Sequence, residues 1–278
     1  MVTRPGKYFF AVILWTVFLS GGCSNDILGL FGSNDISRRW EARNTFNFLK
    51  PGDRNISLGD TYSFIVLSDT HIYNNETYGL EKLKNVIDSN VKFAVINGDV
   101  TQSGKRKEVK HFIQIAESLG VPCYPVAGNH DIFLRNWPEW EELIGSTCYR
   151  IDGGGATLFI LDSANAYFGA KQLDWLEKEM KNTAGRVFVF THSNLFVKSL
   201  ADGQQFTDTL ERARAVSLLK GKCDIMFTGH VHRRIINETD GIQFITTEDF
   251  KTNSAYCLVH VSKDGVRWEF KTVPGAQL

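Results

Sequence analysis

Residues 64–71 read FIVLSDTH, so four consecutive apolar residues are followed directly by a short polar segment containing Asp69 and His71. An apolar run this short, without polar alternation, is typical of a strand buried on both faces of a sheet. Four similar apolar runs, each followed by Asp, Asn or His, occur at 93–96, 121–126, 187–190 and 225–227. Because ligand sites in open α/β sheets lie beyond the carboxyl ends of the strands, this pattern predicts a site at those ends.

Helical candidates lie between these strands, and further strand-like segments follow. Helices are expected near residues 78–89, 105–119, 170–181 and 207–219. Additional strands are expected near 157–161, 233–237, 242–246, 255–261 and 266–270. Alternating strands and helices followed by a β-rich end predict an α/β sandwich in one domain, residues 61–278.

The polar residues at the strand ends are carboxylates, one amide and imidazoles, several of them preceded by glycine. They occur in the segments 68–71 (SDTH), 97–99 (NGD), 128–131 (GNHD), 191–192 (TH) and 229–232 (GHVH). Glycine permits tight turns and a close approach of the backbone. This mixture of ligand types suits Mn, Fe or Zn. Seven candidate ligands are too many for one four-coordinate ion, and two divalent metal ions that share a bridging carboxylate accommodate them.

In this order and spacing, the five motifs closely resemble those of the calcineurin-like metallophosphoesterases. The resemblance spans Asp69 to His232. It implies a two-sheet β-sandwich flanked by helices, with four layers in the order α/β/β/α. It also implies a dinuclear metal-dependent phosphohydrolase, in which a metal-bridging hydroxide attacks phosphorus in line with the ester oxygen.

The resemblance further implies a role for each motif residue. Three residues would bind the first metal: Asp69, His71 and His232. Asp99 would bridge the two ions, and three more residues would bind the second: Asn129, His192 and His230. His130 and Asp131 complete the catalytic set. His130 would contact the phosphate and protonate the leaving oxygen, while Asp131 is expected to support that loop.

Residues near Asp99 differ from those of two other branches of this family, and these differences indicate which branch the sequence resembles. The third residue after Asp99 is Gln102, where purple acid phosphatases have a metal-binding Tyr and serine/threonine phosphoprotein phosphatases have Asp followed by Arg. Residues 98–104 (GDVTQSG) and 121–131 (VPCYPVAGNHD) resemble instead the bacterial cyclic-nucleotide phosphodiesterase-like branch. We therefore expect a phosphodiester in preference to a monoester. The alternative is a non-catalytic cell-surface binding protein on a phosphoesterase scaffold, which the loss of a ligand would favour; none is missing.

The N-terminus resembles a bacterial lipoprotein signal peptide over residues 1–23. Basic residues precede an apolar run at 8–19, and small residues lead to Cys23. The run is shorter than the ~20 residues needed to span a bilayer. We expect export to the bacterial cell envelope, with a lipidated Cys23 anchoring the protein so that it faces the periplasm or the surface. Ser20 replaces the Leu usual in such motifs, so simple secretion and an uncleaved anchor stay alternatives.

Composition narrows the classes of partner. The 278 residues contain 31 basic and 31 acidic side chains, so no global field draws nucleic acid or an acidic membrane surface. We expect a small-molecule phosphate ester as partner and membrane contact only through the lipid anchor, and we infer no protein partner. Residues 24–60, rich in Ser, Asn, Asp and Gly, are expected to form a tether; the alternative for 37–49 is a short helix that carries Trp40 and packs on the domain. The widely spaced cysteines after Cys23 are expected to be mostly buried small hydrophobes.

Overall fold

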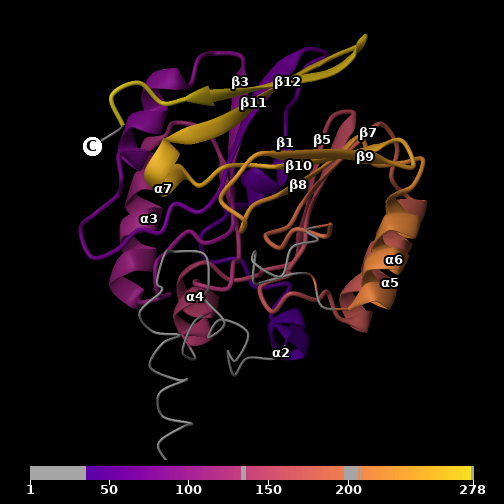
Figure 1. The fold of residues 1–278 in the computed structure, drawn as a ribbon, viewed down its shortest axis with the longest axis horizontal. Helices are drawn as coiled ribbons and strands as arrows, with labels where there is room; N and C mark the ends of the chain where they lie inside the picture. Colours follow the sequence, from indigo (N-terminus) through magenta and orange to yellow (C-terminus); the bar gives the residue numbers. More distant parts are fainter. Residues whose placement is uncertain (1–35, 133–135, 197–205, 207, 277–278) are drawn as a thin grey trace, which may run out of the picture.

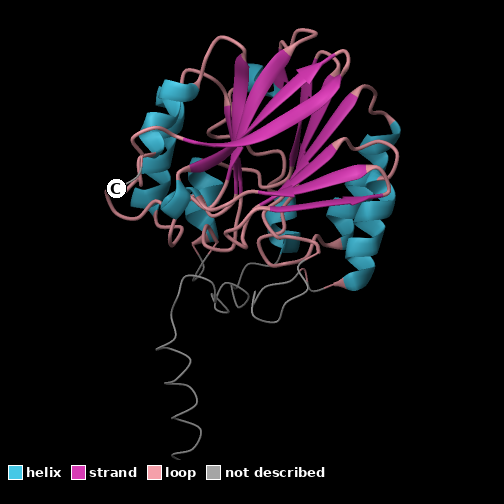
Figure 2. Ribbon diagram, turned by 45° about the horizontal axis from the view of Figure 1, so that its top comes forward, coloured by secondary structure: helices cyan, strands magenta, loops and turns pink. Residues whose placement is uncertain are grey.

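The computed structural model describes residues 36–132, 136–196, 206 and 208–276. Within them, two β-sheets pack face to face and helices cover both outer faces, as Figures 1 and 2 show. The predicted α/β fold, a two-sheet sandwich flanked by helices in four layers, is confirmed. The predicted signal peptide with Cys23, and the first part of the predicted tether at 24–35, lie outside the described residues.

The first sheet has the strand order β12-β11-β2-β3-β4. Its strands are β2 (Tyr62–Leu67), β3 (Val91–Asn97), β4 (Cys123–Val126), β11 (Ala255–Ser262) and β12 (Gly265–Thr272). The second sheet has the order β1-β5-β6-β7-β8-β10-β9. Its strands are β1 (Asn55–Ile56), β5 (Tyr149–Gly153), β6 (Ala156–Ile160), β7 (Arg186–Phe190), β8 (Ile225–Thr228), β9 (Ile235–Thr239) and β10 (Ile242–Thr246). Strands β2, β3 and β4 run parallel, as do β7 and β8, so the motifs that follow them gather at the same edge of each sheet.

The two sheets are held together by an aromatic core. Phe64 and Val66 of β2 point into it, while Ile65 and Leu67, one residue along, point to the outer face. The Phe64 ring lies 4.7 Å from the Phe93 ring and 5.0 Å from the Phe188 ring, between centroids. Burial of each such side chain contributes roughly 1.5–3 kcal/mol. Strands buried on both faces therefore produce the continuous apolar runs seen in the sequence.

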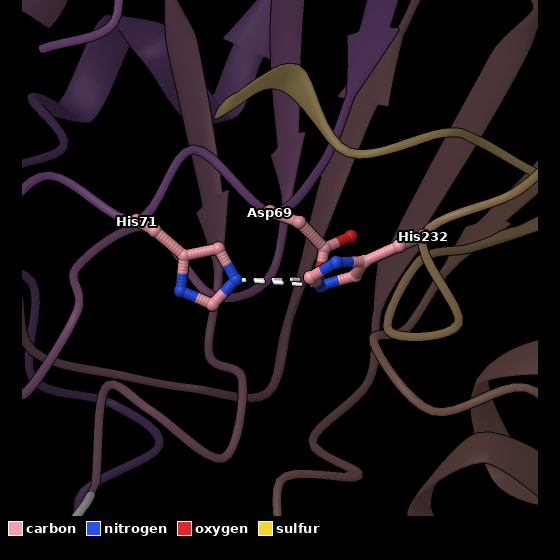
Figure 3. A group of neighbouring side chains, drawn as sticks. All are labelled: Asp69, His71 and His232. Atoms are coloured by element: carbon pink, nitrogen blue, oxygen red, sulfur yellow. Dashed lines mark hydrogen bonds and ion pairs between the residues drawn. The ribbon is translucent and has the colours of Figure 1, made fainter. Parts of the chain in front are cut away.

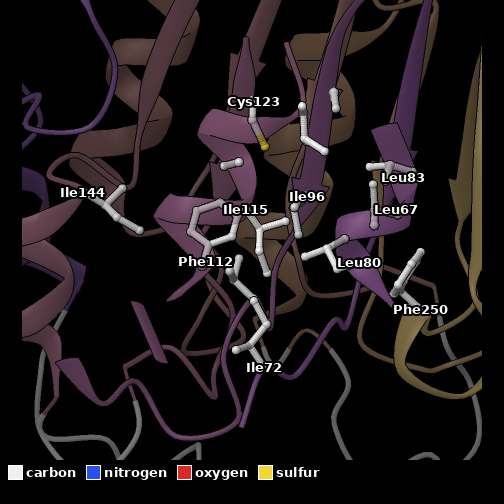
Figure 4. Packing of buried hydrophobic residues seen from close by; sticks show 14 of the residues in the cluster. Leu67, Ile72, Leu80, Leu83, Ile96, Phe112, Ile115, Cys123, Ile144 and Phe250 are labelled. Carbon is white, nitrogen blue, oxygen red and sulfur yellow. The ribbon is translucent and has the colours of Figure 1, made fainter. Parts of the chain in front are cut away.

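Helices cover the outer faces of both sheets. On the first sheet lie η3 (Leu80–Val86), α3 (Arg106–Ser118) and α4 (Trp137–Leu143), and on the second lie α5 (Ala170–Lys181) and α6 (Thr209–Leu219). Figure 4 shows Ile96 of the first sheet beside Ile115 of α3, and Leu67 beside Leu83 of η3. The three longer predicted helices are confirmed, and the segment predicted near 78–89 forms the 3-10 helix η3.

The predicted boundary between tether and domain differs from the structure. Residues 36–60 pack on the domain, through α2 (Ile36–Glu41), the 3-10 helix η2 (Pro51–Arg54) and the pairing of β1 with β5. Arg39 is fully buried, and its guanidinium binds both carboxylate oxygens of Asp162, at 2.6 and 2.9 Å, and Oδ1 of Asn165 at 2.8 Å. A buried guanidinium needs such partners to offset its lost hydration. The polar composition of this segment therefore does not make it a tether.

Cys123, Cys148, Cys223 and Cys257 are buried free thiols, as the sequence indicated. Burial raises the pKa of the Cys123 thiol to about 12, so this thiol stays protonated and unreactive near neutral pH. Among the helices of the described residues, none combines the length and apolar character needed to cross a bilayer.

Candidate metal centre

The predicted ligands lie together, although they come from five separate loops. Asp69 and His71 follow β2, and Asp99 follows β3; the others follow β4, β7 and β8. Three groups of metal-binding atoms form among them, each with its atoms within 4.8 Å of one another. The groups are Asp69, His71 and His232; His71, Asp99 and His130; and Asp99, His192 and His230. The seventh predicted ligand, Asn129, adds an amide oxygen that lies 3.2 Å from Nε2 of His192.

The first group contains two imidazoles and one carboxylate that face one another (Figure 3). Nε2 of His232 lies 3.2 Å from Oδ1 of Asp69 and 3.4 Å from Nε2 of His71. Two facing imidazole nitrogens repel if both present lone pairs, so this arrangement requires a proton or a cation between them. The donor set is therefore suited to a divalent ion.

The group of Asp99, His192 and His230 is arranged around Nε2 of His192. Oδ2 of Asp99 lies 3.3 Å from this atom, and Nδ1 of His230 lies 3.1 Å from it. His192 is fully buried, and its Nδ1 lies 3.1 Å from the carbonyl oxygen of Asn97. A hydrogen bond to that carbonyl keeps a proton on Nδ1 and directs Nε2 toward Asp99 and His230.

Asp99 connects the group around His192 with the group of Asp69, His71 and His232. Its Oδ2 lies 3.3 Å from Nε2 of His192 and 3.8 Å from Nε2 of His71, which belongs to the first group. The carboxylate is almost completely buried, with 2% of the side chain exposed. Among the described residues, Asp99 is therefore the carboxylate that lies close to ligands of both groups.

Charge in the site is balanced by proton sharing between carboxylates and imidazoles. Burial alone would lower the pKa of His192 and His232, but the nearby carboxylates of Asp99 and Asp69 raise both pKa values to about 9. Burial also disfavours the charged forms of Asp69 and Asp99, yet these imidazoles hold the carboxyl pKa values below their ordinary range. Buried charges need compensation of this kind, and divalent ions would supply the same positive charge.

One carboxylate oxygen shows that the site fits a metal. Oδ1 of Asp69 is buried, and no backbone N–H or hydroxyl group donates to it, while Oδ2 accepts the backbone N–H of His230 at 3.0 Å. A buried carboxylate oxygen without a hydrogen-bond donor is costly, and coordination to a cation satisfies it. Oδ1 faces only the imidazoles of His71 and His232, at 4.0 and 3.2 Å from their Nε2 atoms, and these are the other two ligands of its group.

The backbone at the site adopts unusual conformations. Five predicted ligands have positive φ angles: Asp69 (55°), His71 (46°), Asp99 (48°), His230 (71°) and His232 (53°). Each costs on the order of 1–2 kcal/mol for a residue with a Cβ atom. Hydrogen bonds between the loops offset this cost: the N–H of Asp69 donates to the carbonyl of Gly98, and the N–H of His71 to that of Asp99, both at 2.9 Å.

Two glycines let the loops approach closely. A Cβ atom at Gly98 would lie 2.1 Å from Nδ1 of His192, and one at Gly128 would lie 2.2 Å from Oδ1 of Asp99. Both distances are far inside van der Waals contact. The close backbone approach expected of these glycines is therefore present in the structure.

His130 is held by two hydrogen bonds and keeps one nitrogen toward the site. Its backbone N–H donates to Oδ1 of Asp99 at 2.9 Å, and its Nδ1–H donates to the carbonyl oxygen of Gln102 at 2.7 Å. Nε2 lies 4.0 Å from Oδ2 of Asp99, and 13% of the side chain is exposed. This geometry places a proton on Nδ1 and directs Nε2 toward the Asp99 carboxylate.

Asp131 supports the loops and has no free face toward the site. Its two oxygens accept hydrogen bonds from the N–H groups of Val100, Thr101 and Gly128 and from the hydroxyl of Thr101, at 2.8–3.1 Å. Burial, and then the Asp99 carboxylate, raise the pKa of Asp131 to about 7. Asp131 is therefore a positioning residue that joins the loops after β3 and β4.

Sequence motifs did not reveal two residues next to this site. The carbonyl of Gln102 holds His130, and a backbone contact leaves no signature in residue types. Lys251 lies in the short helix α7 (Phe250–Asn253), and its Nζ reaches to 3.5 Å from Oε1 of Gln102. Neither belongs to a ligand motif.

The chain is similar in sequence to bacterial proteins named as probable phosphodiesterases. A probable cyclic nucleotide phosphodiesterase of Fibrobacter succinogenes is 28% identical over 102 residues, which cover 35% of this chain and 40% of that protein. A probable glycerophosphodiester phosphodiesterase of Arcobacter nitrofigilis is 26% identical over 201 residues, covering 61% of this chain and 71% of that protein. The chain thus spans less than half the length of the first of these relatives.

Solved structures with the same fold include phosphatases. A dimetal phosphatase from Danio rerio superposes with a TM-score of 0.58 at 13% identity, covering 76% of this chain and 99% of that one. A purple acid phosphatase from yellow lupin gives a TM-score of 0.63 at 14% identity, covering 80% of this chain and 53% of that one. At these identities the likeness shows the fold. The family model described as Calcineurin-like phosphoesterase matches residues 62–234, which include all seven predicted ligands, and the chain therefore belongs to the calcineurin-like phosphoesterase family.

Proposed function

We propose that the protein is a dinuclear metal-dependent phosphohydrolase that cleaves phosphate esters, phosphodiesters in preference to monoesters. One observation carries this proposal: Asp99 is shared by two of the groups of metal-binding atoms, and His130 lies in one of them. The non-catalytic alternative, a binding protein on the same scaffold, would be favoured by a missing or displaced ligand. All seven predicted ligands are present at the site.

The residues divide into two ligand sets. Asp69, His71 and His232 would hold one ion, and Asn129, His192 and His230 the other, with Asp99 common to both. Nitrogen and oxygen donors of these types suit Mn, Fe or Zn. When bound, such ions would offset the charge of the phosphoryl oxygens and lower the pKa of the attacking water.

His130 is placed to act as the proton donor. Because its Nδ1–H is committed to the carbonyl of Gln102, a proton carried on Nε2 can move to the leaving oxygen. The hydrogen bond from its backbone N–H to Asp99 fixes the distance between this donor and the ligand groups. Asp131 keeps the two loops together through four hydrogen bonds.

The preference for diesters is supported by the relatives. The proteins from Fibrobacter succinogenes and Arcobacter nitrofigilis are both named as probable phosphodiesterases, one for cyclic nucleotides and one for glycerophosphodiesters.

We further propose that the protein is exported and anchored to the bacterial envelope through Cys23. The basic and apolar segments before this residue support that proposal.

The function can be tested with the purified full-length protein. Hydrolysis of bis-p-nitrophenyl phosphate and p-nitrophenyl phosphate is measured after chelation and after addition of Mn, Fe or Zn, with bound metal counted by mass spectrometry. Metal-dependent hydrolysis, faster for the diester, is the expected result. Two bound metals without hydrolysis of either ester would support the binding-protein alternative.

A further inference from the structure

Lys251 carries a positive charge at the edge of the metal centre. Its helix, α7, is fixed to the ligand loop: the N–H of Phe250 donates to the carbonyl of Ser68 at 2.9 Å, and the N–H of Lys251 donates to the carbonyl of Asp69 at 3.2 Å. Phe250 is fully buried in the core beside η3, where Figure 4 shows it. The backbone of Lys251 is therefore anchored to a metal-ligand residue.

The ammonium group reaches toward the proton donor of the site. Nζ lies 3.5 Å from Oε1 of Gln102 and 5.3 Å from the ring centroid of Tyr78. Nε2 of the same Gln102 lies 3.4 Å from Nδ1 of His130. One amide side chain thus separates the ammonium from the imidazole that faces the leaving oxygen.

The surroundings of Lys251 do not neutralise its charge. The side chain is half-buried, and within the described ranges no carboxylate forms an ion pair with it. Its contacts are an amide oxygen at the limit of hydrogen-bonding distance and an aromatic face. An ammonium group has three donors, and a partly desolvated one gains most from an anionic acceptor.

We propose that Lys251 forms an anion subsite beside the metal centre, and that the preferred substrates are phosphate esters whose leaving alcohol carries a second anionic group, a carboxylate or a further phosphate. Lys251 is linked through Gln102 to His130, the proposed proton donor to the leaving oxygen, so we assign to the subsite the part of the substrate attached to that oxygen. A neutral alcohol would leave the ammonium group without an anionic partner. The substrate preference rests on the proposed hydrolytic function, whereas binding at the subsite does not.

The test compares esters that differ only in the charge of the leaving alcohol. Phenyl, 3-carboxyphenyl and 3-phosphonophenyl phosphates are used as monoesters and as methyl diesters, because a meta anion hardly alters the basicity of the phenol. We expect wild type to prefer the anionic esters in kcat/KM, and Lys251→Met to reduce that preference by about fivefold. Lys251→Arg should retain most of this preference. The anionic ester with the larger gain in kcat/KM over the phenyl ester identifies the favoured anion, a carboxylate or the phosphonate that represents a phosphate.

Two other lysines provide matched controls. Lys263→Met removes the same charge at the far end of β11, roughly 26 Å along the strand from Ala255. Lys107→Met removes it from α3, where Lys107 lines a separate cavity of about 570 Å³ with Lys110 and His111. Both variants should keep the wild-type preference. An unchanged preference in Lys251→Met, or an equal loss in either control, would overturn the proposal.

A binding measurement separates this inference from the proposed function. Phenylphosphonate and 3-carboxyphenylphosphonate, which are not hydrolysed, are titrated into the metal-loaded protein by calorimetry. Wild type should bind the carboxylated compound more tightly, and Lys251→Met should lose the difference. If wild type binds the carboxylated compound more tightly but hydrolyses no ester, the subsite is supported and the proposed hydrolytic function is wrong. If wild type binds both compounds equally, the proposed subsite is wrong.

Discussion

The backbone N–H of His130 donates a 2.9 Å hydrogen bond to Oδ1 of Asp99. The proposed proton donor and the proposed bridging carboxylate are therefore one structural unit. Asp99 uses one oxygen to hold the loop of His130 and directs the other toward His192 and His71. Because this bond comes from the backbone of His130 and not from its ring, removing the Asp99 charge and removing the His130 imidazole should have separable effects.

Asp99→Asn should abolish binding of at least one metal ion and lower turnover by about 100-fold or more. The amide retains an oxygen that can accept the N–H of His130, so the loop should stay in place while the charge is lost. Metal content by mass spectrometry and the rate of bis-p-nitrophenyl phosphate hydrolysis check this. Two tightly bound metals with wild-type turnover would show that Asp99 is not the bridge.

His130→Ala should retain both metals and lose roughly 10²–10⁴-fold in kcat, since general acid catalysis supplies about that factor. The loss should be larger for alkyl esters, whose leaving oxygen needs a proton, than for p-nitrophenyl esters. Steady-state kinetics on both substrate types, with metal content as the control, make the comparison. Equal losses for the two types would argue against proton donation by Nε2.

Gly98→Ala should disrupt the site, because the new Cβ would lie 2.1 Å from Nδ1 of His192. Gly120→Ala is the matched control: its φ is also positive, at +77°, but nothing lies within 4 Å of the added atom. The control should lose only about 1–2 kcal/mol of folding free energy and keep its metal affinity. Calorimetric unfolding and metal titration distinguish the two, and unchanged metal affinity in Gly98→Ala would contradict the close packing.

Metal binding should release protons near neutral pH. The pKa values of His192 and His232 are raised to about 9, so below that pH in the metal-free protein each imidazole is a cation with both ring nitrogens protonated. His71 and His230, whose pKa values burial lowers to about 3, are already neutral. Because metals bind the neutral imidazole, apparent affinity should rise with pH and level off above about 9. Calorimetry in buffers of different ionisation enthalpy measures the release, and an affinity independent of pH between 6 and 8 would contradict it.

Cys23→Ser should move the protein from the membrane fraction to the soluble fraction, since the acyl chain would have no attachment site. Fractionation followed by immunoblotting checks this. Unchanged membrane association of the variant would exclude lipidation at Cys23 as the anchor.

The sequence predicts the fold and the positions of the candidate ligands well, for one physical reason. Strands buried on both faces are continuous apolar runs, so the polar residues that end them are conspicuous, as Phe64 to His71 illustrate. Parallel neighbours then bring these ends together without further information.

The sequence alone does not predict contacts between side chains that are far apart along the chain. Arg39 lies in a polar segment, and nothing local reveals that its partner is Asp162, 123 residues away. The anchoring of His130 by a main-chain carbonyl has no side-chain signature. Lys251 is one of many lysines, and only the backbone hydrogen bonds of α7 to the loop of Asp69 bring it to the site.

The packing of residues 36–60 has a consequence for how far the protein can extend from an envelope surface. With Cys23 as the attachment point, 12 residues, 24–35, separate it from α2. Fully extended, they cover at most ~40 Å, against ~130 Å for a free segment reaching residue 60. The buried pair of Arg39 and Asp162 thus sets the reach of the domain, and an anchored molecule would sample only a shallow layer next to the lipid.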